Sequence, residues 1–151
     1  MTQRQTKSSG GSPRGHEFIE GTLSTPSLQY DLTEEIKQLH QKESWHQETG
    51  RSSKTLVKYA DLRIVLIAMK AKTRMHDHKT TGRISVQTIS GHIRLHLPER
   101  IADLPAGNLV ALDQCLEHDV EALEESAFLL SIFWPPEAEI ERCGTSPAEA
   151  K

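Results

Sequence analysis

The sequence predicts an all-β protein: one small barrel or sandwich of short strands, preceded by a single helix. Short apolar runs separated by turn residues fill the chain from about residue 52 onward. In one run, Ile93, Leu95 and Leu97 alternate with polar residues. Gly91, preceded by a serine, marks a tight hairpin, and residues 104–107 form a further turn signal. The predicted strands are Thr55–Tyr59, Leu62–Met69, Arg83–Ile89, Ile93–Leu97, Leu109–Leu112, His118–Leu123 and Phe128–Trp134.

A helix is predicted near residues 31–43. Asp31 precedes it as an N-cap, and its apolar residues recur on one face as Leu32, Ile36 and Leu39. A helix with one apolar stripe needs a larger surface to pack against, and the predicted strands supply that surface.

Polar composition at both ends of the chain predicts arms that do not pack, because such segments bury too little apolar surface to offset their ordering entropy. The predicted organisation is a disordered arm at 1–29, a helix and linker at 30–50, the barrel at 51–135 and a flexible tail at 136–151.

Composition excludes several classes of protein. The chain has 151 residues and a formal net charge of −3, without the basic excess of a dedicated nucleic-acid binder. It has no apolar run of about 18 residues, so no membrane association is expected. Two cysteines, Cys115 and Cys143, make no disulfide framework. With no secretory signal visible, we expect a cytoplasmic protein.

Three histidines form a candidate metal site. His76 and His78 stand two residues apart, so in a regular strand both side chains project from one face. His118 lies near the start of a later strand and can supply a third imidazole. Converging imidazoles suit a borderline divalent metal such as Fe, Zn, Ni, Cu or Mn.

At these positions the sequence resembles the cupin superfamily of small, RmlC-like jelly-roll barrels. The first cupin motif carries H-x-H and ends in a hairpin glycine, here His76, His78 and Gly91. The second has a glycine followed eleven residues later by a metal-binding histidine, here Gly107 and His118. The resemblance implies a cupin-type jelly-roll barrel with a metal bound by the three histidines.

The chain departs from the family at several positions. The glutamate ligand of the first cupin motif is replaced by Ile84, and three turn residues of the second motif become Asp113, Cys115 and Ala122. Gln87 is a candidate fourth ligand on the same strand as Ile84, although its parity is opposite. The usual four-ligand site is therefore not expected.

The resemblance implies metal-dependent chemistry on a small polar molecule, with oxygenation or isomerisation as the reaction. Some cupins with three histidines and no carboxylate, the thiol dioxygenases among them, bind iron and oxygenate small substrates. Arg74 shares parity with His76 and is a candidate anchor for a substrate carboxylate. The alternative is a non-enzymatic cupin that binds or senses a ligand with a degenerate or empty metal site.

A homodimer is expected, with segment 50–60 in the interface. The strand predicted at Thr55–Tyr59 would be an edge strand, and exposed edges are usually paired or covered. Cupins commonly dimerise by packing or exchanging such strands. If the helix stripe covers its own barrel instead, a monomer is acceptable.

Overall fold

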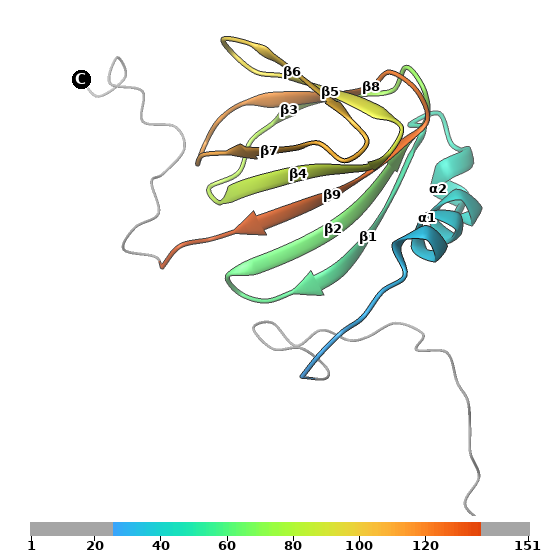
Figure 1. Ribbon diagram of the computed structural model, residues 1–151, viewed down its shortest axis with the longest axis horizontal. Coiled ribbons are helices and arrows are strands. Elements are labelled where there is room, and N and C mark those ends of the chain that lie inside the picture. Colours follow the sequence, from blue (N-terminus) through green and yellow to red (C-terminus); the bar gives the residue numbers. More distant parts are fainter. Residues whose placement is uncertain (1–25, 137–151) are drawn as a thin grey trace, which may run out of the picture.

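The computed structural model describes residues 26–136, which form two antiparallel sheets and two short helices (Figure 1). The helices are α1 (Leu32–Gln41) and α2 (Glu43–His46). The strands are β1 (Arg51–Lys58), β2 (Leu62–Met69), β3 (Arg74–His78), β4 (Arg83–Ser90), β5 (His92–His96), β6 (Ile101–Pro105), β7 (Leu109–Leu112), β8 (His118–Ala122) and β9 (Ser126–Phe133). The predicted arm and tail lie largely outside the described residues, as does Cys143.

The strand order is that of a jelly roll. β2 pairs with β9, β3 with β8, β4 with β7 and β5 with β6, so the second half of the chain folds back along the first. One sheet has the order β1-β2-β9-β4-β7 and the other the order β3-β8-β5-β6. The all-β prediction is confirmed at this level.

The sheets do not close into a barrel, which corrects the barrel expected from the sequence. Strands β1 and β7 are the edges of the five-stranded sheet, and β3 and β6 are the edges of the other. Within the described residues no hydrogen-bonded ladder joins one sheet to the other. The molecule is therefore a sandwich whose two layers are held together by side-chain packing.

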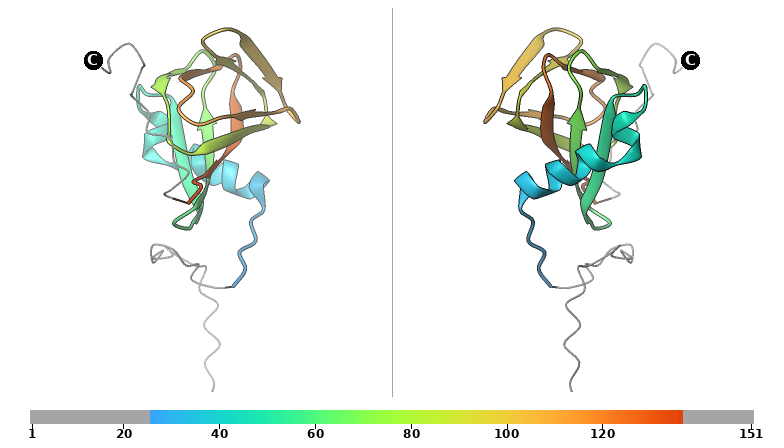
Figure 2. Two further views of the ribbon diagram at one scale, coloured as in Figure 1. Left: turned by 90° about the vertical axis from the view of Figure 1, so that its left-hand side faces the viewer. Right: turned by 90° about the vertical axis from the view of Figure 1, so that its right-hand side faces the viewer.

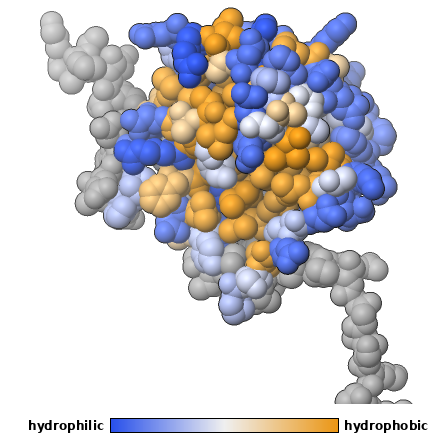
Figure 3. Space-filling view, in the orientation of Figure 1, coloured by the Kyte–Doolittle hydropathy of each residue, from blue (hydrophilic) through white to orange (hydrophobic). Residues whose placement is uncertain are grey.

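The core lies between the two sheets, and β2 shows how its sequence places it there. Ile67 and Met69 of β2 point into the core between the sheets, whereas Leu66 and Ala68 point to the opposite face and lie under the helices. Because both faces of β2 are covered, its sequence is a continuous apolar run rather than an alternating one. Figure 3 shows apolar residues gathered over the middle strands of this sheet.

The helix prediction is confirmed. The Asp31 carboxylate accepts hydrogen bonds from the backbone N–H groups of Thr33 and Glu34, at 3.0 and 3.3 Å. The stripe containing Leu39 packs with Trp45 and the outer face of β1 and β2. Both helices lie in front of the strands in the right-hand view of Figure 2. The helix stripe therefore covers its own domain.

Strand β6 was not predicted. Its outward residues include Ile101 and Pro105, and its buried ones include the small Ala102, so the run lacks a strong strand signal. The turn predicted at residues 104–107 lies one residue later, at 105–108. There the Asn108 N–H group donates to the carbonyl oxygen of Pro105 at 3.0 Å. Neither helix of the described part is long and apolar enough to cross a membrane.

Candidate functional site

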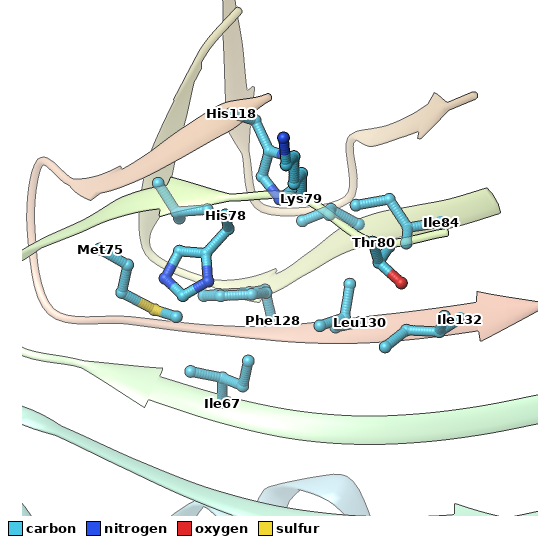
Figure 4. A pocket seen from close by; sticks show the side chains of 12 residues that line it. Ile67, Met75, His78, Lys79, Thr80, Ile84, His118, Phe128, Leu130 and Ile132 are labelled. Carbon is cyan, nitrogen blue, oxygen red and sulfur yellow. The ribbon is translucent and has the colours of Figure 1, made fainter. Parts of the chain in front are cut away.

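A cavity between the sheets, which we call the inner pocket, is the candidate functional site. Its volume is about 170 Å³, and it is lined by eight apolar and four polar side chains. The polar ones are His78, Lys79, Thr80 and His118. In Figure 4 the rings of His78 and His118 lie on one side of the pocket, and Phe128 lies opposite them.

Two of the three predicted metal ligands meet in this pocket. His78 of β3 and His118 of β8 are register partners on neighbouring strands, and their ring centroids are 6.3 Å apart. His118 is buried, with 9% of its surface exposed. The two imidazoles therefore face the same space, as their predicted role requires.

One ring nitrogen of His118 is fixed by the backbone. His118 Nδ1 lies 3.0 Å from the carbonyl oxygen of Leu116. A carbonyl only accepts hydrogen bonds, so Nδ1 must carry the proton. In the neutral ring the lone pair is then on Nε2. This nitrogen can accept a hydrogen bond from a ligand or bind a metal.

His76 does not join His78 and His118. A register shift separates Met75 from His78, so that residues 76 and 77 of β3 lie opposite the single residue Asp119 of β8. This β-bulge breaks the alternation from which a shared face was predicted. Met75 and His78 both line the inner pocket, whereas the His76 side chain is 63% exposed and its Nδ1 lies 3.2 Å from Asp119 Oδ2.

Arg74 keeps the parity predicted for it but lies on the same outer face as His76. Its Nε and Nη2 atoms donate to Asp119 Oδ2 at 3.2 and 2.9 Å. It is not among the residues that line the inner pocket. The structure therefore does not place Arg74 where it could anchor a ligand in that pocket.

The position of the family's glutamate ligand does face the pocket, but it holds an isoleucine. Ile84 is buried and lines the inner pocket. Gln87 is exposed, because the irregularity in β4 falls later, between Thr88 and Ser90, and leaves its outward parity unchanged. Neither residue supplies a ligand to the space between His78 and His118.

These positions do not fit the three-histidine metal centre. Within the described residues, no three side chains from histidine, cysteine, aspartate and glutamate gather in a way that could hold a metal ion. Cys115 has a φ of 60° and so occupies the tight turn where the family has glycine. No cysteine of the described residues is a free thiol, so Cys115 offers no zinc thiolate.

Sequence reasoning missed most residues of the inner pocket, among them Met75, Lys79 and Thr80. Met75 faces inward because of the bulge, and Lys79 and Thr80 lie in the loop after β3. A bulge leaves no periodic signal in one sequence, and the loop residues follow no motif. Lys79 Nζ lies 3.6 Å from Glu117 Oε1, and its side chain is 46% exposed, which places it at the rim.

The outer face of the four-stranded sheet carries cross-strand ion pairs. His96 Nε2 lies 2.6 Å from Glu121 Oε2, and this hydrogen bond is the main cause that lowers the pKa of the Glu121 carboxyl. Arg94 donates to Asp103 at 2.9 Å and lowers the pKa of that carboxyl in the same way. His92 and His96 therefore lie on a polar surface, each beside a carboxylate.

Comparison with solved structures identifies the fold. A cupin superfamily protein from Desulfitobacterium hafniense superposes with a TM-score of 0.56 at 12% identity, covering 59% of this chain and 82% of that one. An RmlC-like cupin from Shewanella frigidimarina gives 0.54 at 14%, covering 60% and 81%. Salicylate 1,2-dioxygenase from Pseudoaminobacter salicylatoxidans, in a structure with gentisate, gives 0.62 at 13%, covering 69% of this chain and 32% of that one.

No protein-family model and no curated protein sequence matches the chain. Two facing antiparallel sheets in jelly-roll order define the class of the fold. The similarity to solved cupins then specifies it: the chain has a cupin-type fold. At these identities the comparisons carry the fold alone.

Proposed function

We propose that this protein binds a small, largely apolar molecule in the inner pocket, without a three-histidine metal centre. The observation that carries the proposal is the pocket itself, with apolar walls and two imidazoles on one side. Ligand sites combine such apolar walls with a few polar groups that orient the ligand.

The volume of the inner pocket limits the size of the ligand. At about 170 Å³ it is smaller than the roughly 300 Å³ at which typical drug-sized sites begin. It is close to the roughly 150 Å³ of an engineered apolar cavity that binds benzene. The buried part of the ligand is therefore about the size of one ring or a short branched alkyl group.

His118 supplies the polar recognition. Because its Nδ1 donates to Leu116, its Nε2 is an acceptor and selects a hydroxyl or N–H group on the ligand. A ligand whose hydroxyl or N–H group donates to Nε2 therefore gains affinity over one of the same shape that has no donor there.

Metal-dependent oxygenation or isomerisation has less support. It requires the divalent metal expected at His76, His78 and His118, and His76 faces the opposite side of its strand. The similarity to salicylate 1,2-dioxygenase is a similarity of fold.

The binding test uses phenol and toluene, which differ in the one hydroxyl that His118 would accept. We expect both to perturb NMR signals of Phe128 and Ile67, and phenol to bind more tightly. Ile132→Phe, which fills the pocket, should weaken both, whereas Ile89→Phe on the other face of β4 should not. Absence of binding by either compound to the wild-type protein would refute the proposed function.

Elemental analysis tests the metal alternative separately. Protein purified without chelator should contain transition metal well below one equivalent. One full equivalent that is lost in each of the variants His76→Ala, His78→Ala and His118→Ala, but kept in His92→Ala, would establish the three-histidine centre instead.

A further inference from the structure

A second cavity, which we call the seam pocket, lies where the two sheets do not meet. Its volume is about 400 Å³, and it lies between β1 and β2 of one sheet and β3 of the other. Strands β1 and β3 are edge strands, so their polar backbone groups and side chains are not covered by a further strand. Four hydroxyl side chains, Arg51, Ile67 and Met75 line it.

The seam pocket carries a positive charge that no carboxylate in its lining balances. Arg51 forms no ion pair with another residue of the described range, whereas Arg74, Arg83 and Arg94 each pair with an aspartate. Arginine among hydroxyl groups, with no acid beside it, is a favourable setting for an anion. A carboxylate suits it best, because the guanidinium can donate two parallel hydrogen bonds to it.

The seam pocket and the inner pocket share two lining residues. Ile67 and Met75 belong to both cavities, so these side chains are the partition between the apolar space and the polar one. Methionine is unbranched and adapts its shape readily, so a ligand can pass beside it at low cost. One molecule can therefore occupy both cavities, with its apolar end inside and its polar end at the seam.

We propose that the seam pocket is an anion subsite, in which Arg51 and the surrounding hydroxyl groups bind the carboxylate of an amphipathic ligand whose apolar end fills the inner pocket. This inference rests on the proposed function and adds the chemical class of the ligand: a monocarboxylate with a ring-sized apolar end and a short spacer.

The test compares three compounds by isothermal titration calorimetry: 4-phenylbutyrate, its uncharged analogue 4-phenylbutan-1-ol, and benzoate. We expect the wild-type protein to bind phenylbutyrate about fivefold more tightly than the alcohol, and Arg51→Gln to remove most of this difference, which is modest because an exposed charge is screened. Added salt should also reduce this difference in affinity between phenylbutyrate and the alcohol, as Arg51→Gln does. Arg100→Gln, at an exposed turn, is the matched control.

Benzoate tests the geometry of the subsite. With its ring in the inner pocket, benzoate has no spacer to carry its carboxylate past Ile67 and Met75, so Arg51→Gln should leave its affinity unchanged. If the alcohol binds but phenylbutyrate gains nothing over it, or if Arg51→Gln weakens benzoate equally, the subsite is refuted and the inner-pocket function stands. If no compound binds, both proposals are refuted.

Discussion

Two of the predicted metal ligands differ in burial: His118 is buried and His76 is exposed. Replacing each of them should therefore change the free energy of unfolding by different amounts. His118 is buried, and its loss leaves the Leu116 carbonyl without a donor, at a cost of about 1–3 kcal/mol. His76 is exposed, so His76→Ala should change the free energy of unfolding by no more than about 0.5 kcal/mol. Urea denaturation of His118→Ala and His76→Ala measures both. Equal losses would contradict the placement of these two side chains.

The outer-face carboxyls make stability depend on pH in one direction. The hydrogen bond from His96 lowers the pKa of Glu121 in the folded state, so its stabilisation is present above the ordinary glutamate pKa and is lost as the pH falls. We expect the free energy of unfolding to decrease below about pH 4.5, because the unfolded chain then binds more protons at this site.

Glu121→Gln should reduce the slope of that decrease, measured by chemical denaturation between about pH 3 and pH 6. Glu99→Gln at an exposed turn is the control. An unchanged slope in Glu121→Gln would mean that the His96 contact does not persist in solution.

At the scale of the element, the bulge in β3 separates what could be predicted from what could not. The sequence shows that His76 and His78 stand two residues apart, and a regular strand would place both on one face. The extra residue opposite Asp119 depends on how β3 pairs with β8, a contact between segments more than forty residues apart. Local spacing therefore identifies His78 and His118 but cannot identify which neighbour of His78 faces inward.

Some strands could likewise be predicted from the sequence, and others could not. Strands β2 and β7 have their predicted bounds because apolar runs and turn residues mark both ends. Strand β6 escaped prediction because its buried residues are only Ala102 and Leu104 and its pairing with β5 supplies most of its order. Local patterns also could not show that the two sheets stay open, since closure depends on which edge strands pair with each other.

The hairpin at Gly91 offers an element-scale prediction. Gly91 has a φ of +79°, and a Cβ there would collide with the carbonyl oxygen of Glu125 and the side chain of Ser126. Ser126 Oγ accepts from His92 N–H at 2.9 Å, so the neighbouring turns are tied at this point. Gly91→Ala should therefore destabilise the fold by at least about 2 kcal/mol.

Gly107→Ala is the matched comparison. Gly107 also has a positive φ, of +88°, but a Cβ there would meet nothing within 4 Å. Its cost should be the backbone strain alone, about 1 kcal/mol. Thermal denaturation of both variants separates the cost of backbone strain from the cost of the steric collision. If Gly107→Ala lost as much stability as Gly91→Ala, the close approach of Gly91 to Glu125 and Ser126 would be contradicted.

At the scale of the whole molecule, the helices decide which surfaces stay open. The Lys54 amino group pairs with Glu35 at 2.7 Å, and Tyr30 OH donates to the Leu56 carbonyl at 2.7 Å, so the N-terminal segment is held against β1. This covers the outer face of β1 and β2 but not the free edge of β1. Because the helix stripe covers its own domain, a monomer is acceptable.

The homodimer through residues 50–60 stays a prediction. Light scattering at micromolar concentration should give a mass near twice the 16.9 kDa of the chain, because the edge of β1 is free to pair with a second copy. Val57→Pro, which removes a backbone donor from β1, should shift the mass toward that of one chain. A wild-type mass of one chain would reject the dimer, and a dimer unaffected by Val57→Pro would place its interface elsewhere.

Ile84 has a consequence for protein engineering. It lies in the wall of a pocket that already holds two imidazoles, one of them oriented by a backbone carbonyl. A carboxylate at this one position would complete a set of two histidines and one acid, a ligand combination that open non-haem iron sites use. The single substitution Ile84→Glu is therefore a direct way to design a metal site into this cavity.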